Sequence, residues 1–293
     1  MQLGVLINYY SFGGAPSGLG PLLAEIARTA DDAGFTMIGA VDHVWQHPIM
    51  GGAELEELEG YTTLGFLAAH TRRAKLITLV TCPPYRQPGL LAKIVTTLDV
   101  LSGGRAWLGI GAGDYVEEAR GLGLPFPPVK QRFEMLEETI QICLRMWSGA
   151  RGDEGAFRGT YYQLERLLNS PQSLSRPHPP ILIGGNGEQK TLRLVARYAD
   201  ACNLSPSPEL PRKLEVLRQH CAAEGRDYDA IEKTCMFGFD IGENGSQIGE
   251  LIGRLRWLSS MGIQTVIGAI PQRDPVATLD AIGREVLPAV AEL

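Results

Sequence analysis

Short apolar runs and amphipathic stretches alternate along the whole of this chain. Residues 2–8 form the first apolar run, the pattern of a strand that is buried on both faces. Residues 21–33 then carry leucine, isoleucine and alanine at every third or fourth position, and Gly34 comes directly after them. That spacing predicts a helix with one buried face, and the glycine predicts its end.

The same strand-then-helix pattern occurs eight times. The predicted strands are residues 2–8, 35–41, 75–81, 105–110, 181–183, 200–204, 233–240 and 264–270. The predicted helices are residues 21–33, 61–71, 88–101, 131–147, 188–198, 208–224, 246–261 and 275–290. Eight such units without a polar linker predict a single domain over residues 1–293, an α/β fold of the closed parallel (β/α)8 or TIM-barrel type. A doubly wound open sheet is the alternative.

Two segments are too long to be plain connections between neighbouring elements. One covers about residues 42–60, after the second strand, and the other covers about residues 148–180 and is rich in Gly, Pro and Arg. Long insertions in a compact domain commonly bind ligands or close over a site. We therefore expect both to be substrate or lid loops at the C-terminal face of the barrel.

Composition and charge exclude several classes of protein. The chain has 293 residues and a net charge of −6, so a general attraction to nucleic acid or to an anionic membrane is not expected. It contains no apolar run long enough to span a bilayer and no basic leader. Its five cysteines are widely spaced without a C-x-x-C, which indicates neither a disulfide framework nor a zinc site. A cytoplasmic protein is expected.

In a parallel barrel, chemistry is found where the strands end. The fourth predicted strand ends on alternating glycines, Gly109, Gly111 and Gly113, followed by Asp114. Glycines at a strand end let a flat or anionic group lie close to the backbone. The stretch lacks the third glycine of the dinucleotide fingerprint G-x-G-x-x-G, because Asp114 stands in that place.

The second strand ends on a group that has several interpretations. His43 and His47 are four residues apart, but without a predicted helix or a third ligand nearby we expect no metal. His43 with Asp42 is either a structural hydrogen-bonded pair or a donor to cofactor or substrate. Trp45 either fills the core of the loop or stacks near a bound ring. Asp114 is either a helix cap or a proton donor.

Two further strand ends carry candidates. Cys82, after the third strand, has no activating partner in view, so we expect a small buried side chain rather than a nucleophile. Residues 184–187, Gly-Gly-Asn-Gly, join the fifth strand to its helix. Their N–H groups either bind an anion or form a plain tight turn.

Several of these stretches resemble the bacterial luciferase-like superfamily of flavin and deazaflavin oxidoreductases, along nearly the whole chain. The similarity is closest to the branch that uses the deazaflavin coenzyme F420, which includes F420-dependent glucose-6-phosphate dehydrogenases. The stretches that carry it are Asp42-His43, Val80-Thr81-Cys82-Pro83, Tyr85-Arg86-Gln87-Pro88, the run from Thr97 to Arg105, Leu108 to Gly113, Arg132-Phe133 with Leu136-Glu-Glu, and Pro180 to Gly185.

The resemblance implies a cofactor ring across the strand ends, with coenzyme F420 as the cofactor and FMN as the alternative. It implies a cis non-proline peptide near Leu79-Val80, a homodimer, and a small-molecule substrate. His43 would lie beside the ring, with Asp114 and Trp45 as the other catalytic candidates. The implied cofactor-binding residues are Asp42, His43, Leu79, Val80, Cys82, Gly111, Ala112, Gly113, Gly184, Gly185, Asn186 and Gly187.

Two departures from the sugar-phosphate dehydrogenases affect the expected substrate. Those enzymes carry a glutamate where this chain has Asp114, and a lysine after the sixth strand where this chain reads Asn203-Leu-Ser. Glucose 6-phosphate is therefore not the expected substrate. We expect an F420H2-dependent reductase of an electron-poor C=C, C=N or C=O. An FMN-dependent monooxygenase and a non-catalytic cofactor-binding subunit are the alternatives.

Overall fold

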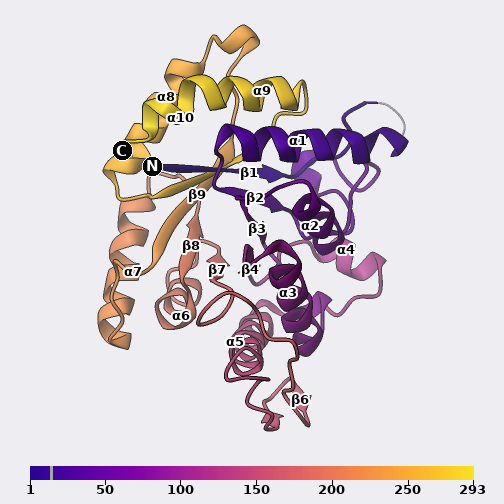
Figure 1. Ribbon diagram of the computed structural model, residues 1–293. Coiled ribbons are helices and arrows are strands. Elements are labelled where there is room, and N and C mark those ends of the chain that lie inside the picture. The colour runs from indigo at the N-terminus through magenta and orange to yellow at the C-terminus, as the bar shows by residue number, and fades with distance from the viewer. Residues whose placement is uncertain (14–15) are drawn as a thin grey trace.

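Eight parallel strands form a closed barrel in the computed structural model, which describes residues 1–13 and 16–293. The order around the barrel is β1, β10, β9, β8, β7, β4, β3, β2, so the predicted (β/α)8 fold is confirmed (Figure 1). The strands are β1 (Gln2–Ile7), β2 (Met37–Ala40), β3 (Lys75–Thr78), β4 (Ala106–Ile110), β7 (Ile181–Gly184), β8 (Ala201–Leu204), β9 (Glu232–Gly238) and β10 (Thr265–Ala269).

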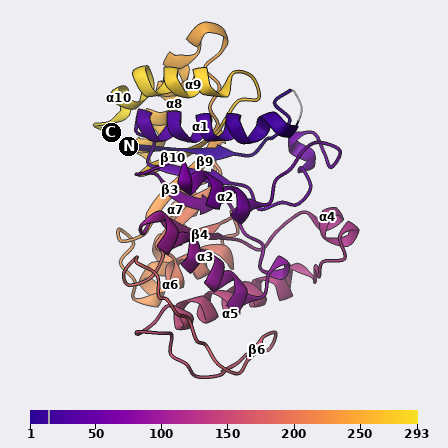
Figure 2. The ribbon, with the colours of Figure 1, turned by 45° about the vertical axis from the view of Figure 1, so that its right-hand side comes forward.

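Helices surround the strands as an outer layer (Figures 1 and 2). The two termini lie side by side, where the ammonium group of Met1 donates to the carbonyl of Val290 at 2.9 Å. The helices are α1 (Leu19–Ala33), α2 (Gly60–Ala69), α3 (Pro88–Ser102), α4 (Val116–Gly121), α5 (Val129–Met146), α6 (Thr191–Tyr198), α7 (Leu210–Glu224), α8 (Ile248–Ser260), α9 (Pro275–Ala281) and α10 (Leu287–Val290).

The inside of the barrel is a small apolar core separate from the larger one between strands and helices. Its buried members are Leu6, Met37, Ile77, Trp107, Leu182, Ala201 and Ile267. Val41, Leu79 and Val80 pack on this core and are only partly buried. These three residues, at the C-terminal ends of β2 and β3, form an apolar floor to the mouth of the barrel.

The end of β3 carries a bulge, and the cis peptide expected at Leu79-Val80 is present. Ile77 pairs with Trp107, but the next pairing is Thr81 with Ile110, so β3 has one extra residue between the two. An extra residue in one strand re-aims the side chains around it. Here it places Leu79 and Val80 on the floor of the mouth.

The glycines of β4 and β7 make room for this bulge. A Cβ on Gly109 would lie 1.8 Å from the carbonyl oxygen of Thr78, and one on Gly111 would lie 2.7 Å from a methyl carbon of Val80. A Cβ on Gly184 would lie 2.8 Å from the other Val80 methyl. The sequence predicted that glycines at the end of β4 leave space for a ligand, but it did not predict that the bulge of β3 packs against them. The protein's own bulge fills that space and forms the surface above it.

The insertion at residues 148–180 does not lie over the strand ends. It contains a short hairpin of β5 (Phe157–Arg158) and β6 (Gln163–Leu164) and packs along the outer faces of α3 and α5 (Figure 2). Glu138 of α5 accepts three backbone N–H groups of residues 160–162, and Asp99 of α3 accepts those of residues 174 and 175. Residues 42–60 are therefore the remaining candidate for a substrate loop.

Apart from shifts of one or two residues at helix ends, three helices differ from the prediction. Helix α4 is absent from it, because six residues are too few to show a periodic pattern. Helix α6 begins at Thr191 rather than at 188, after a turn. The predicted last helix is interrupted by a π-turn, Ile282–Val286, directly before α10. Pro288 has no N–H for the carbonyl four residues earlier, which accounts for the interruption.

Candidate active site

The segment 42–60 is anchored at both ends. Asp42 is buried, and Arg86 pairs with it through two hydrogen bonds, one of them 2.8 Å long, while also pairing with Glu59. Burial lowers the pKa of Arg86, but the charge of Asp42 outweighs this and raises it. Gly60 packs against residue 41, since a Cβ there would lie 2.7 Å from the carbonyl oxygen of Val41. Asp42 thus holds the loop, which is a structural role.

Glu118 of α4 is fully buried and organises the beginning of this segment. It accepts hydrogen bonds from the backbone N–H of Val44 and from that of Trp45 at 2.9 Å. It also accepts one from the hydroxyl of Tyr85 at 2.6 Å and one from Nδ1 of His43 at 3.2 Å. Burial raises its pKa, but these four donors more than offset it, so the pKa of Glu118 lies below its usual value. Glu118 is an anion at neutral pH.

His43 is oriented by that anion. Because an ionised carboxylate only accepts, Nδ1 of His43 carries a proton, and Nε2 is the ring nitrogen that Glu118 leaves free. Burial lowers the pKa of His43, but its hydrogen bond with Glu118 and the charge of Glu118 outweigh burial and raise it. The imidazole side chain is 25% exposed. It is therefore both held in place and open to a ligand.

His47, Asp114 and Tyr115 lie close to His43. The His43 and His47 rings are 5.1 Å apart, and Tyr115 lies edge-on to both at 5.8 and 5.0 Å. Ligand-type atoms of His43, His47 and Asp114 lie within 4.8 Å of one another. Our expectation that no third ligand lies near the two histidines was therefore wrong, because the fold brings Asp114 beside them.

The tautomer of His47 argues against treating this group as a metal site. Its Nδ1 accepts the backbone N–H of Ile49 at 3.3 Å, which caps a short 3-10 turn. In neutral histidine an accepting Nδ1 leaves the proton on Nε2, where no lone pair remains for a metal. The arrangement is instead that of side chains able to hydrogen-bond a polar substrate.

Trp45 packs against the end of α4. A Cβ on Gly121 would lie 2.0 Å from the indole, so ring and backbone are in close contact. Its backbone N–H is bound by Glu118, as described above. The structure thus supports a packing role for Trp45, and a role beside a bound ring stays a prediction.

The loop after β4 is held from outside by Arg132 of α5. This guanidinium donates to the carbonyl of Ala112 at 2.9 Å and to that of Gly113 at 3.3 Å. Gly113 has φ of 74°, and a Cβ there would lie 2.3 Å from Sγ of Cys82. Burial raises the pKa of the Cys82 thiol to about 12. Cys82 is therefore the small buried side chain that we expected, and its burial disfavours the thiolate form.

Residues 184–187 form a separate rim at the end of β7. Asn186 and Ser205 exchange two hydrogen bonds, at 2.8 and 2.9 Å, which join this rim to the end of β8. Gly185 has φ of 131°, a conformation that other residues rarely adopt. The buried ammonium group of Lys213 donates to the carbonyl of Asn186 at 3.3 Å. The rim is thus rigid, polar and glycine-lined.

Sequence reasoning missed Glu118 and also Glu57. Glu57 lies near the end of the 42–60 segment, and its Oε2 is buried without a hydrogen-bond partner among the described residues. Burial raises the pKa of Glu57 to about 8. A signal for Glu118 existed, since it follows the glycine-rich strand end by five residues. Glu57 has no such signal.

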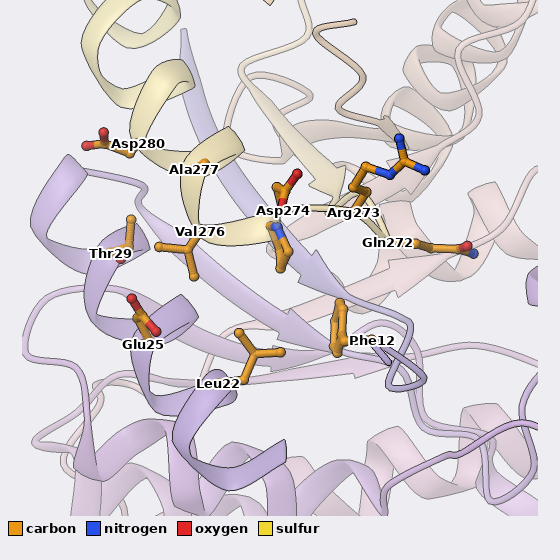
Figure 3. Close-up of a pocket in the computed structure, with 11 residues that line it drawn as sticks. Phe12, Leu22, Glu25, Thr29, Gln272, Arg273, Asp274, Val276, Ala277 and Asp280 are labelled. Carbon is orange, nitrogen blue, oxygen red and sulfur yellow. The ribbon is translucent and has the colours of Figure 1, made fainter. Parts of the chain in front are cut away.

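A cavity of about 730 Å³ lies outside this group, between α1 and α9 (Figure 3). Leu22, Glu25 and Thr29 line it from α1, and Val276 and Ala277 line it from α9. None of the predicted cofactor residues lines this cavity. It is a surface hollow between two outer helices.

The chain belongs to the luciferase-like monooxygenase family, whose model matches residues 1–280. An uncharacterised protein of Mycobacterium tuberculosis is 30% identical over 218 residues, which are 70% of this chain and 75% of that protein. An F420-dependent glucose-6-phosphate dehydrogenase of Nakamurella multipartita is 33% identical over 219 residues. That match covers 72% of this chain and 60% of the dehydrogenase.

Solved structures share the fold at low identity. One is an F420-dependent secondary alcohol dehydrogenase in complex with an F420-acetone adduct, with a TM-score of 0.80 at 17% sequence identity. The match covers 99% of this chain and 98% of the dehydrogenase chain. The F420-dependent tetrahydromethanopterin reductase of Methanopyrus kandleri has a TM-score of 0.78 at 18%, covering 98% and 99%. A long-chain alkane monooxygenase has a TM-score of 0.81 at 13%, covering 100% and 91%.

Among the described residues, the helices are all too short or too polar to cross a membrane.

Proposed function

We propose that this protein is an F420-dependent oxidoreductase, acting as an F420H2-dependent reductase of a small organic substrate with an electron-poor C=C, C=N or C=O. The observation that carries the proposal is the partly exposed apolar floor of Val41, Leu79 and Val80, beside a histidine fixed by a buried anion. A planar ring can rest on such a floor with one face open to a substrate. The relatives named as F420-dependent dehydrogenases support the choice of cofactor.

The residues at the strand ends fit a bound deazaflavin. Leu79 and Val80 would lie under the ring, with Gly111, Ala112 and Gly113 at its edge, and the rim of residues 184–187 would hold the phosphate-bearing chain. Asp42 and Cys82 would support this surface from behind. When bound, reduced F420 supplies a hydride and the protein supplies orientation and the matching proton.

His43 is the residue that we place nearest the substrate. Nδ1 of His43 donates its proton in a hydrogen bond to Glu118. Nε2 is therefore the atom that can hydrogen-bond or protonate a substrate heteroatom. Asp114 and His47 face the same space and would orient the substrate's polar groups. Asn203, which donates to Thr234 at 2.8 Å, is a neutral side chain in the stretch where the sugar-phosphate dehydrogenases carry a lysine. This supports a substrate other than a sugar phosphate.

A second candidate is an FMN-dependent monooxygenase. The family's own description and the structural similarity to an alkane monooxygenase favour it. Such an enzyme would consume oxygen, whereas F420 chemistry transfers a hydride and would not. The homodimer and the cytoplasmic location stay predictions; all five cysteines are free and buried, as expected of a reducing compartment.

Binding titrations of the purified protein test the choice of cofactor. We expect F420 to bind at least tenfold more tightly than FMN, measured by fluorescence in parallel titrations. Val80→Ala should weaken F420 binding because it removes two methyl groups from the floor. Val129→Ala, an exposed valine at the start of α5, is the matched control and should not. Tighter binding of FMN, together with oxygen consumption on reduction, would favour the monooxygenase instead.

A further inference from the structure

The two oxygens of the Glu118 carboxylate accept different kinds of donor. Oε1 accepts the backbone N–H groups of Val44 and Trp45. Oε2 accepts two side chains, Nδ1 of His43 at 3.2 Å and the hydroxyl of Tyr85 at 2.6 Å. One oxygen therefore fixes the backbone of the loop, whereas the other is shared between His43 and Tyr85.

Tyr85 is held at this oxygen by the short turn between β3 and α3. The turn contains two buried prolines, and the backbone N–H of Tyr85 donates to the carbonyl three residues earlier at 3.0 Å. Arg86, the next residue in the chain, pairs with Asp42. Two neighbouring residues of one turn thus hold Asp42, which precedes His43, and Glu118, which binds it.

Two donors on one oxygen compete for its negative charge. A hydrogen bond to the ionised form of a carboxyl group lowers its affinity for protons, and the Tyr85 hydroxyl is the closer donor at Oε2. The carbonyl of Tyr115 also lies within 3.3 Å of that hydroxyl, but the contact with Glu118 is much shorter. The single hydroxyl proton is therefore directed at Glu118, and it reduces the charge that Oε2 presents to a protonated His43.

The titratable and charged groups around the pair of His43 and Glu118 come from several elements. They are Tyr85 after β3, Asp114 and Tyr115 after β4, and His47 and Glu57 in the segment that carries His43. Asp114 and Glu57 act on His43 through their charge, and more weakly than Glu118 does. Among the described residues, Glu118 is the hydrogen-bond partner of the imidazole. A change at Tyr85 should therefore reach His43 through Glu118.

We propose that Tyr85 is a positioning residue: its hydroxyl limits how strongly Glu118 holds the protonated form of His43, so that Nε2 can release a proton to the substrate. This inference rests on the proposed function for the reaction in which His43 acts. The substrate carbon takes a hydride from reduced F420, and the substrate heteroatom takes the proton from Nε2. His43 becomes neutral, keeps its Nδ1 proton, and regains the Nε2 proton from water. Only the substrate and the cofactor change oxidation state.

An NMR titration of His43 in the cofactor-free protein tests this hydrogen-bond arrangement. In Tyr85→Phe the imidazole should keep its positive charge to a higher pH than in the wild type, because His43 no longer shares Oε2. Tyr198→Phe is the matched control, since the Tyr198 hydroxyl donates to another carboxylate, Glu137, at 2.9 Å between the outer helices. It should leave the His43 titration unchanged. A titration of Tyr85→Phe at the wild-type pH, or at a lower one, would overturn the proposal.

A double variant tests whether Tyr85 acts through the carboxylate. With glutamine at position 118, adding Tyr85→Phe should move the His43 titration no further, because the shared anion is already gone. If Tyr85→Phe raised the titration as much in Glu118→Gln as in the wild type, Tyr85 would act on the ring by another route, and the proposal would be wrong.

The pH profile of turnover with reduced F420 tests the consequence for catalysis. In the wild type kcat should decline at alkaline pH, as His43 loses its Nε2 proton. Tyr85→Phe should move this decline to higher pH, in step with the NMR titration. It should also lower kcat below the decline about tenfold, because a more tightly held proton is transferred more slowly. KM for the cofactor should not change. An alkaline decline that stays in place in Tyr85→Phe would contradict the role of Tyr85.

The NMR and turnover experiments separate this inference from the proposed function. If the protein bound FMN and not F420, the proposed function would fail, while the NMR titrations would still decide whether Tyr85 acts on His43. If F420 bound and turned over in Tyr85→Phe with the wild-type pH profile, the proposed function would stand and the role of Tyr85 would be refuted.

Discussion

At the scale of single residues, the position of His43 depends on one buried carboxylate. Glu118 binds the imidazole and the two backbone N–H groups that follow it in the chain, so it sets both the loop and the ring. The buried anion is tolerated because each of its oxygens accepts two hydrogen bonds. Glu118, the residue that sets the position of His43, therefore lies outside the group of side chains that faces the mouth.

We predict that Glu118→Gln lowers the pKa of His43. Without that carboxylate, burial disfavours the charge of the imidazole and is opposed only by the smaller effects of Asp114 and Glu57. His43 is protonated below its pKa, so in the variant its positive charge is lost at a lower pH than in the wild type. Proton NMR of the five histidines measures this titration.

The variant should also cost about 1–3 kcal/mol of unfolding free energy, because buried donors lose their charged acceptor. Glu117→Gln is the matched control, since Glu117 is the exposed neighbour on α4. It should change neither the titration nor the stability. An unaltered His43 titration in Glu118→Gln would show that another group sets the state of the ring.

At the scale of elements, the mouth is built from the contact between the bulge of β3 and the glycines of β4 and β7. The glycines that the sequence predicted as space for a ligand are positions where β4 and β7 pack closely on the bulge, Gly109 against its backbone and Gly111 and Gly184 against the Val80 side chain. Gly109 is the most restricted of them, because a Cβ there would meet the Thr78 carbonyl at 1.8 Å.

Gly109→Ala should therefore destabilise the barrel by about 3 kcal/mol or more, since backbone rather than a flexible side chain must move. Gly65→Ala is the opposite case, at an exposed position inside α2 with no atom within 4 Å of the added Cβ. It should stabilise the protein by about 0.5–1 kcal/mol, because alanine favours the helix. Urea unfolding of both variants decides. Equal effects of the two would contradict the proposed backbone contact.

Asp31, buried on α1, holds the turn that leads into β3. It accepts the backbone N–H groups of Arg72, Arg73 and Ala74, at 2.9, 3.0 and 2.7 Å. Burial raises its pKa, but these donors outweigh burial and lower it. A carboxyl whose folded pKa is depressed adds stability above its unfolded pKa and loses it as pH falls through the folded one.

Asp31→Asn should accordingly cost about 1–3 kcal/mol at pH 7. The difference from the wild type should shrink as pH falls below about 4, where the wild-type carboxyl takes up a proton. Unfolding free energies at pH 7, 5 and 3 measure it. A difference that stays constant over this range would mean that the charge of Asp31 does not matter.

How far the sequence predicted these elements depended on their length and burial. Strands such as β1 and β10 were predictable because a strand buried on both faces is a continuous apolar run. Helix α4 and the β5–β6 hairpin were not, since six and two residues show no period. The residues around His43 were predicted from the strand end, but Glu118 was not, because its contacts with His43 and Trp45 lie 73 to 75 residues away in the chain.

At the scale of the whole molecule, the closed barrel brings the predicted groups to one face. Asp42, Val80, Gly111 and Gly184 are distant in sequence, yet each stands at the end of a neighbouring strand. The order β2, β3, β4, β7 places the floor in the middle, the histidine pair on one side and the glycine rim on the other. A cofactor with a planar ring and a phosphate-bearing chain matches that layout.

The most direct measurement is a crystal structure of the protein with F420. We predict that the deazaflavin ring lies on Leu79 and Val80, with Nε2 of His43 beside its open face and its phosphate on residues 184–187. A ring bound elsewhere, for example in the cavity between α1 and α9, would contradict the account.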